Sequence, residues 1–519
     1  MQSYFFLSIT HVCKGKFLTL AQVSSQACEL LMPPNSPNFP TPIYICAKPA
    51  HMNSLRFLFA VAFVALLSCQ SQAQPNWQVG NTTLTEYDLV TGISLPWEIL
   101  WGADDHIWCT LRTGQVLRID PETGNYTEIL DIEVMGDGGS EPGLLGMCLH
   151  PDFETTPLVY LVYNSGNPWN GGAEHLVSYE WDGNSLSNQV VILEDIEAGG
   201  IHNGSRIMIT EDGKIMMTTG DAGDGGTSSQ NMNSNNGKVL RINLDGTVPA
   251  DNPNPDSYVW SMGHRNAQGI CQGPDGIIYS SEHGQSSHDE LNIIEADRNY
   301  GWPEVEGICD LASEATFCAE NNVMGPIKEW SPCIAVNGIE YYDHPSIPEW
   351  QNSILMSVLG GLNGAYERLS VLHMSADGTA VESEDQFFSD FNQRIRDVCV
   401  NPYTGAVYLA FNGPSYPGSG PNTIKEFVND GVIDNVIDRK QDQFISIYPN
   451  PVTTSATIEF SKSLIGSDLV IHDYTGKVVE SQEITSTQMN IEKGFLPAGQ
   501  YYIQASSSLG TLSKSFIIQ

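Results

Sequence analysis

Short apolar runs separated by turn residues dominate the chain from Trp77 to about Val436. Each run is about five residues long and rich in β-branched and aromatic types, which is typical of strands. No stretch shows the apolar spacing of an amphipathic helix. The pattern predicts an all-β chain, with strands at Glu98–Trp101, Ile107–Leu111, Val116–Ile119, Leu158–Tyr163, Lys214–Thr219, Ile277–Ser281, Ile354–Val358 and Val407–Ala410.

A weak repeat connects these strands, because a tight turn precedes an outgoing strand at four places. The four segments are Asp104–Trp108, Glu211–Ile215, Gly273–Ile277 and Asn401–Gly405. Hairpins that recur in this way favour a β-propeller, in which four-stranded blades cover one another's faces and close into a ring. We predict a six-bladed β-propeller over residues 77–436. A pair of β-sandwiches is the alternative that the pattern leaves open.

The net charge of the chain bears on whether it can bind nucleic acid. The chain has 519 residues with 23 Lys and Arg against 61 Asp and Glu, a net charge of −38. Nucleic-acid binding needs clustered cations, so this composition argues against a nucleic-acid partner. The length permits two to three domains.

The region before the strands predicts export. An apolar run at Leu55–Leu67 begins near Arg56 and is followed by the small and polar residues Ser71–Ala73, the order found in secretory signal peptides. The run is too short to span a bilayer. We expect a signal peptide at 52–73 and cleavage after Ala73, with residues 1–51 an upstream translation artefact or an unstructured extension. Because Leu66–Cys69 resembles a lipoprotein box, a lipid anchor on Cys69 is the alternative.

Seven cysteines follow residue 74, and an odd number in an oxidising compartment leaves at least one thiol free or paired between chains. Cys309, Cys318 and Cys333 share one polar stretch, so we expect a disulfide among them. No cysteine or histidine spacing indicates zinc.

A polar linker near Asn429–Asp442 predicts a separate C-terminal unit at 442–519. Its alternating strands at Ala456–Phe460, Asp468–His472, Lys477–Glu480, Met489–Ile491, Gln500–Ala505 and Ser513–Ile518 indicate a small antiparallel β-sandwich. The Tyr448–Pro451 opening, the Tyr474–Lys477 turn and the Leu496–Tyr502 stretch resemble the C-terminal sorting domains of the type IX secretion system. The resemblance implies export by that machinery and a secreted or cell-surface protein.

Three polar clusters interrupt the strand pattern. Gly199–Arg206 sets His202 among glycines, where a ligand can approach the backbone closely. Gly263–Gly269 gathers His264, Arg265, Asn266 and Gln268. Glu282–Glu290 offers carboxylates and loop carbonyls, the hard oxygen ligands that suit Ca²⁺. Taken singly, the clusters fit equally well a turn histidine, a structural hydrogen-bond network and a solvated acidic loop.

Taken in order, the clusters resemble the soluble quinoprotein sugar dehydrogenases of the glucose/sorbosone dehydrogenase type, on the aldose dehydrogenase-like branch. Four further stretches agree, at Trp97–Gly124, Gly143–Phe153, Gly237–Pro253 and Asn392–Val398. The likeness extends over about residues 90–430. It implies a six-bladed propeller that binds pyrroloquinoline quinone (PQQ) and Ca²⁺ and oxidises an aldose sugar, with an external electron acceptor.

The resemblance also implies roles for individual residues. His202 falls on the general base, Asp221 on the aspartate that orients it, and Arg265 on the cation that stabilises developing negative charge. The expected cofactor-binding residues are His106, Arg265, Asn266, Arg394 and Arg396. The expected Ca²⁺ ligands are Gly284, Gln285, Glu290 and Tyr300.

The chain departs from the glucose enzymes at several of these places. The cofactor-binding lysine expected near Val358–Gly361 is absent, and Ile201 replaces an acidic residue before His202. Two rivals therefore stay open, a non-catalytic propeller that binds carbohydrate or protein at the cell surface and a calcium-dependent propeller lactonase. Arg394 and Arg396 favour the quinone enzyme over the lactonase.

Overall fold

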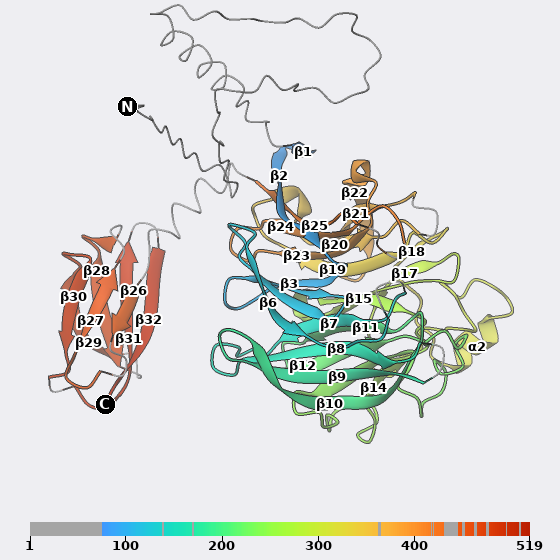
Figure 1. The fold of residues 1–519 in the computed structure, drawn as a ribbon, viewed down its shortest axis with the longest axis horizontal. Helices are drawn as coiled ribbons and strands as arrows, with labels where there is room; N and C mark the ends of the chain where they lie inside the picture. The colour runs from blue at the N-terminus through green and yellow to red at the C-terminus, as the bar shows by residue number, and fades with distance from the viewer. Residues whose placement is uncertain are drawn as a thin grey trace, which may run out of the picture. The chain divides into compact units, whose positions relative to one another are not determined.

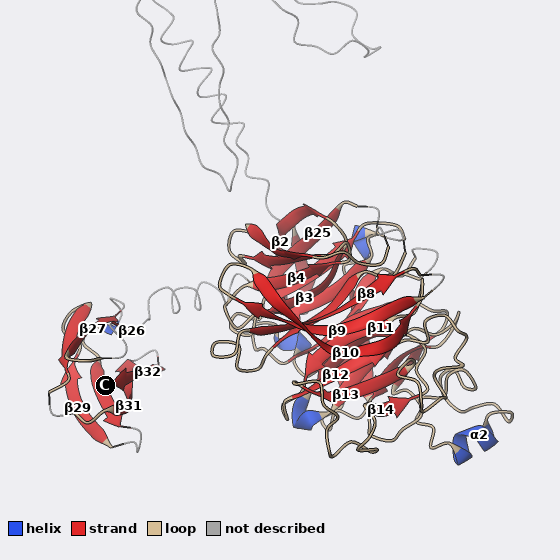
Figure 2. Ribbon diagram, turned by 60° about the horizontal axis from the view of Figure 1, so that its bottom comes forward, coloured by secondary structure: helices blue, strands red, loops and turns tan. Residues whose placement is uncertain are grey.

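The computed structural model describes residues 75–519 except 137–139, 169–170, 362–364, 417, 419, 430–444, 449–451, 461–463, 474–476, 495 and 508–509. The predicted signal peptide, the upstream segment, Cys69 and most of the predicted linker lie outside the described residues. Strands dominate the described chain, and the all-β prediction is confirmed (Figure 1; Figure 2).

Residues 76–428 form six antiparallel sheets. Three sheets contain the strands β3 (Pro96–Trp101), β4 (Ile107–Leu111), β5 (Gln115–Ile119) and β6 (Tyr126–Asp131); β7 (Leu144–Leu149), β8 (Leu158–Gly166), β9 (Gly172–Trp181) and β10 (Leu186–Ala198); and β11 (Gly204–Ile209), β12 (Lys214–Thr219), β13 (Lys238–Asn243) and β14 (Val259–Met262).

The other three sheets contain β15 (Ala267–Gln272), β16 (Ile278–Glu282), β17 (Asp289–Ile293) and β18 (Lys328–Trp330); β19 (Val336–Tyr342), β20 (Ser353–Val358), β21 (Arg368–Met374) and β22 (Val381–Phe387); and β1 (Asn76–Val79), β2 (Thr82–Ile93), β25 (Asn422–Val428), β24 (Val407–Asn412) and β23 (Ile395–Val400). In the last of these, β2 pairs with β25, so the sheet joins the two ends of the region.

The sheets are arranged in a ring. The strands β3, β7, β11, β15, β19 and β23 contact one another in that order, and β23 contacts β3. Each sheet therefore presents both faces to its neighbours, and the apolar cores lie between sheets. One core packs Ile99 and Cys109 against Cys399 and Tyr408. Burial on both faces explains why inner strands such as β4 and β24 are continuous apolar runs rather than alternating ones.

Helical structure is sparse in the part of the chain that the structure describes. The helical elements there are α2 (Ala315–Glu320) and the 3-10 turns Pro274–Gly276, Pro348–Trp350 and Ser389–Phe391. Helix α2 is too short for apolar periodicity to show in the sequence, and it leaves the all-β prediction unchanged. The predicted disulfide is confirmed, because Cys309 bonds to Cys318 within this segment and leaves Cys333 free. None of the described helices has the length and apolar character that crossing a bilayer requires.

Residues 445–519 form two antiparallel sheets around one apolar core. The core takes Ile458 and Ile491 from one sheet and Leu469, Ile503 and Phe516 from the other. The strands are β26 (Ile445–Tyr448), β27 (Ser455–Phe460) and β30 (Gln488–Glu492) in the first sheet, and β29 (Val478–Glu483), β28 (Asp468–Asp473), β31 (Gly499–Ser507) and β32 (Gly510–Ile518) in the second.

Candidate functional site

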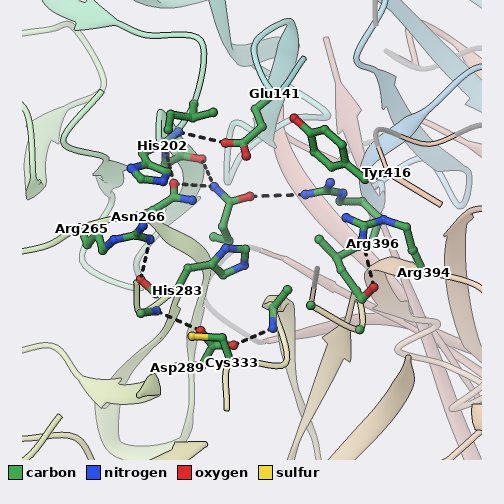
Figure 3. A pocket seen from close by; sticks show the side chains of 18 of the residues that line it. Glu141, His202, Arg265, Asn266, His283, Asp289, Cys333, Arg394, Arg396 and Tyr416 are labelled. Carbon is green, nitrogen blue, oxygen red and sulfur yellow. Dashed lines mark hydrogen bonds between the residues drawn. The ribbon is translucent and has the colours of Figure 1, made fainter. Parts of the chain in front are cut away.

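A cavity of about 590 Å³ opens at one end of the ring of sheets (Figure 3). Its walls come from the segments that precede the first strand of a sheet or follow the second strand. Because consecutive strands are antiparallel, these two kinds of segment lie at the same end of every sheet. The polar and charged lining residues are Arg112, Glu141, His202, Asn203, Arg265, Asn266, Gln268, His283, Gln285, Ser286, Asp289, Arg394 and Arg396.

His202 lies at the cavity in a left-handed backbone conformation, with φ of 58°, just before β11. Its Nδ1 lies 2.8 Å from Oδ1 of Asp221, which follows β12. Asp221 is almost fully buried, and it also accepts hydrogen bonds from the backbone of Gly223 and the indole of Trp302. Burial raises the pKa of Asp221, but hydrogen bonding and the attraction of His202 outweigh it, and the pKa is lowered overall. The carboxylate thus fixes the imidazole with Nδ1 as the donor.

The Gly263–Gly269 loop is held by a buried carboxylate. Glu282 accepts hydrogen bonds from the backbone of Arg265 and Asn266, and its other oxygen lies 2.8 Å from Nδ1 of His264. His264 is fully buried and belongs to this supporting layer rather than to the cavity wall. Asn266 turns its amide oxygen toward the backbone N–H of Gly204, which ties the loop to the segment that carries His202.

Arg394 and Arg396 lie at the start of β23 and line the same cavity. Nη1 of Arg394 donates to the carbonyl of Leu359 at 3.2 Å, and Nη1 of Arg396 donates to the amide oxygens of Gln268 and Asn337 at 3.3 Å. These acceptors are neutral. Burial lowers the pKa of both guanidiniums, and the neighbouring arginines lower that of Arg396 further. Cationic groups held in this way favour an anionic ligand.

Buried N–H donors that lack an acceptor also favour an anionic ligand. Within the described part of the chain, the Nε atoms of Arg265 and Arg394 are buried without a hydrogen-bond partner. The guanidinium of Arg265 contacts the carbonyl of His283, at 3.3 Å, and the face of Trp302, whose ring centre lies 5.2 Å from the guanidinium carbon. A buried donor without an acceptor is costly, so these side chains suit a ligand that supplies acceptors.

Asp289 organises the loops on the opposite wall. Its carboxylate accepts hydrogen bonds from the backbone of Gly284 at 2.9 Å and of Ala335 at 2.6 Å. Cys333, next to this carboxylate, is a free thiol on the cavity wall, and burial followed by the charge of Asp289 raises its pKa. His283 contacts the carbonyl of Val336, and burial lowers its pKa.

The four predicted Ca²⁺ ligands are divided between two hollows. Gly284 and Gln285 line the main cavity, whereas Glu290 and Tyr300 line a much smaller neighbouring hollow that Gly284 also borders. The two carboxylate oxygens of Glu290 accept hydrogen bonds from Asn292 and Gly307, and the Tyr300 hydroxyl donates to the carbonyl of Ile293. Burial raises the pKa of Glu290 to about 8. Among the described residues, no group of three or more His, Cys, Asp or Glu side chains is placed to hold a metal ion.

His106 does not lie with the other predicted residues. It stands in the turn between β3 and β4, where its Nδ1 contacts the carbonyl of Asp104 and the guanidinium of Arg118. The cavity lies at the other end of β4, where Arg112 follows the strand. A five-residue strand is roughly 16 Å long, so the geometry does not support a cofactor contact for His106.

Sequence reasoning missed several residues of the cavity wall, among them Arg112, Glu141, Cys333 and Tyr416. Glu141 accepts a hydrogen bond from the backbone N–H of His202 at 2.9 Å, and Tyr416 lies with its ring 5.8 Å from the guanidinium carbon of Arg394. In Figure 3, Glu141 and Tyr416 lie on the side of His202 and Arg394 that is away from Asp289. A signal was present, because each of these residues precedes a first strand or follows a second strand.

The chain is similar to several known proteins. The chain is 34% identical over 252 residues to quinoprotein glucose dehydrogenase B of Acinetobacter calcoaceticus, an alignment that covers 43% of this chain and only 53% of that protein. It is 27% identical over 370 residues to the aldose sugar dehydrogenase YliI of Escherichia coli, covering 67% of this chain and 94% of the relative. The structure of the PQQ-bound aldose sugar dehydrogenase of Streptomyces coelicolor superposes with a TM-score of 0.57 at 29% identity, over 69% of this chain and 99% of that one.

Two family profiles match the chain. The secretion system C-terminal sorting domain matches residues 446–519, which indicates that the protein is exported. The glucose/sorbosone dehydrogenase profile matches residues 93–415, which is more than half of the sequence. The match includes every strand from β3 to β24. The chain therefore belongs to the glucose/sorbosone dehydrogenase family.

Proposed function

We propose that this protein is an exported PQQ-dependent dehydrogenase that oxidises aldose sugars at the anomeric carbon to lactones. One observation carries the proposal: buried arginines with neutral partners surround the same cavity as a His–Asp pair. The chain has a net charge of −38, yet four arginines line this cavity. A cationic cavity fits a polyanionic cofactor rather than a neutral sugar alone.

The described residues fit PQQ, which carries three carboxylates. Arg394 and Arg396 would grip carboxylates of the cofactor, and the orphaned Nε of Arg394 has a donor to offer. Asn266 and Arg265 would contact the ring from the wall that carries His202. When bound, PQQ supplies the acceptor for the hydride that leaves C1 of the sugar.

The protein's own part in the reaction is proton transfer and charge stabilisation. With Nδ1 held by Asp221, His202 has its other ring nitrogen for the proton of the anomeric hydroxyl. Asp221 stabilises the imidazolium that results. The guanidinium of Arg265 places a fixed positive charge where negative charge develops.

An ion has two candidate positions near the cofactor site. The carbonyls of Gly284 and Gln285 are the candidates for an ion at the cofactor, with Glu290 and Tyr300 at a separate position in the small hollow. Both oxygens of Glu290 already accept hydrogen bonds, from Asn292 and Gly307.

The architecture that we propose for this function has four parts. The six sheets are the blades of a propeller at 77–436, and the two C-terminal sheets are a sandwich at 442–519. We propose a signal peptide at 52–73 before them; it and residues 1–51 lie outside the described residues. The match to a sorting domain supports export by the type IX machinery and a secreted or surface location, where an external acceptor would take the electrons. A lipid anchor on Cys69 has no support from the comparisons.

The test is dye reduction by the purified protein with PQQ, with and without Ca²⁺, across a panel of aldoses. We expect turnover that requires PQQ, and we expect His202→Ala to lower it by about a hundredfold or more, the usual scale of a lost general base. PQQ binding without turnover would indicate a binding protein instead. Lactone hydrolysis without PQQ would indicate the lactonase.

A further inference from the structure

Trp302 lies in the segment between β17 and α2, where it lines the small hollow next to the main cavity, and hydrogen bonds of its backbone fix its position. Its N–H donates to the carbonyl of Gly263 at 3.0 Å, and its carbonyl accepts from the amide of Gln230 at 2.7 Å. The indole is therefore held against the Gly263–Gly269 loop on one side and against the segment after β12 on the other.

The indole contacts both halves of the proposed catalytic machinery. Its Nε1–H donates to Oδ2 of Asp221 at 3.0 Å, while Oδ1 of the same carboxylate receives Nδ1 of His202 at 2.8 Å. Its ring lies under the guanidinium of Arg265 at 5.2 Å. One side chain thus joins the carboxylate of the proposed base to the proposed charge-stabilising cation.

We propose that Trp302 is a positioning residue that orients Asp221 through its N–H and Arg265 through its ring. The inference rests on the proposed function. It assigns two separable tasks to one side chain: the N–H spreads the charge of Asp221 and limits how strongly this carboxylate attracts the His202 proton, and the ring holds the guanidinium flat against the cavity wall.

The consequence for His202 has a definite sign. Without the indole donor, Asp221 becomes a stronger acceptor toward His202 and the imidazolium is stabilised. The titratable and charged groups that share the surroundings of His202 are Asp221, Glu141, His283, Asp289, Arg112, Arg265, Arg394 and Arg396.

The experiment separates the two tasks with two variants of the full chain. Trp302→Phe keeps an aromatic face for Arg265 and removes the N–H, whereas Trp302→Leu removes both. Trp260→Phe is the matched control, because Trp260 also lies under an arginine, Arg241 at 5.0 Å, but its N–H has no partner among the described residues.

The first measurement needs neither cofactor nor turnover. The Cε1–H resonance of His202, assigned by its absence in His202→Asn, is titrated by NMR. We expect the midpoint to rise by roughly 0.5–1 pH unit in Trp302→Phe and to stay unchanged in Trp260→Phe. If Trp302→Phe does not fold, benzothienylalanine at position 302 replaces the N–H with sulfur at nearly the same shape. A midpoint equal to wild type in the folded variant would overturn the inference.

The second measurement uses the loaded enzyme. In Trp302→Phe the acidic limb of the kcat–pH profile should move upward with the NMR midpoint, with the sugar KM unchanged. In Trp302→Leu the plateau kcat should fall by about tenfold, because the cation–π contact is lost as well. An equal plateau in the two variants would remove the ring from the inference. Inactivity of the wild-type protein would refute the proposed function alone, because the NMR titration decides the role of Trp302 independently.

Discussion

Arg206 and the cavity arginines Arg394 and Arg396 are all buried in the ring of sheets, but the groups that they contact differ. Arg206, on β11, pairs with Glu98 at 2.7 Å and with Asp397 at 3.1 Å, and it stacks on the ring of Trp97. Arg396, the neighbour of Asp397 on β23, contacts only amide oxygens through its Nη1. Gln268 lies between the groups, because its carbonyl accepts from Arg206 and its side chain accepts from Arg396.

The difference shows how the same residue type serves stability in one place and binding in the other. The Arg206 group joins three strands, since Glu98 is on β3 and Asp397 on β23, and its charges are compensated within the protein. Arg394 and Arg396 are buried with neutral hydrogen-bond partners, which costs folding free energy. We infer that the protein accepts this cost because a ligand supplies the missing anions.

The largest expected effect is on stability, when the ion pairs of Arg206 with Glu98 and Asp397 are broken. Arg206→Met leaves Glu98 and Asp397 buried without a cation and should lower the free energy of unfolding by about 3–5 kcal/mol, measured by urea denaturation. The matched control is Arg241→Met, which breaks pairs with the largely exposed carboxylates of Asp212 and Asp251 and should cost about 1 kcal/mol or less. Equal losses in the two variants would mean that compensation at the centre of the ring contributes nothing special.

A smaller effect in the opposite sense tests the cavity group. Arg394→Ala removes a buried cation whose partners are neutral, so the free energy of unfolding without cofactor should stay unchanged or rise. Half-saturation by PQQ should need roughly 10–100 times more cofactor, since a hydrogen bond to a charged group contributes about 1.5–3 kcal/mol. The kcat at saturating PQQ should stay close to that of wild type. Equal losses in reconstitution and in saturated turnover would show that Arg394 does not act as a cofactor clamp.

Strand positions could be predicted from the sequence because inner strands are short, continuous apolar runs bounded by turns. β4 and β12 have the predicted bounds, and β24 begins where expected. Helix α2 could not be predicted, because its six residues bury no side chain and so present no apolar face that a sequence pattern could show.

The residues that were predicted from sequence motifs lie at or next to one cavity, with the exception of His106. His202, Arg265, Asn266, Arg394 and Arg396 do line one cavity. Glu141 and Tyr416 lie in loops without a motif, and only the closure of the ring brings them to His202 and Arg394. Trp302 could not be predicted, since neither its hydrogen bond to Asp221 nor its stacking on Arg265 follows from sequence spacing.

The smallest expected effect is on PQQ binding when His106, which lies outside the cavity, is replaced. His106 and Arg112 flank the same strand, but only Arg112 lines the cavity. Because His106 lies at the far end of β4, His106→Ala should leave PQQ half-saturation within about twofold of wild type, which is under 0.5 kcal/mol. Arg112→Ala, its control on the cavity side, should raise half-saturation by roughly tenfold or more through the loss of a charged donor. A tenfold loss in His106→Ala with no change in Arg112→Ala would place the cofactor at the other end of the ring, and the cavity arginines would then need a different ligand.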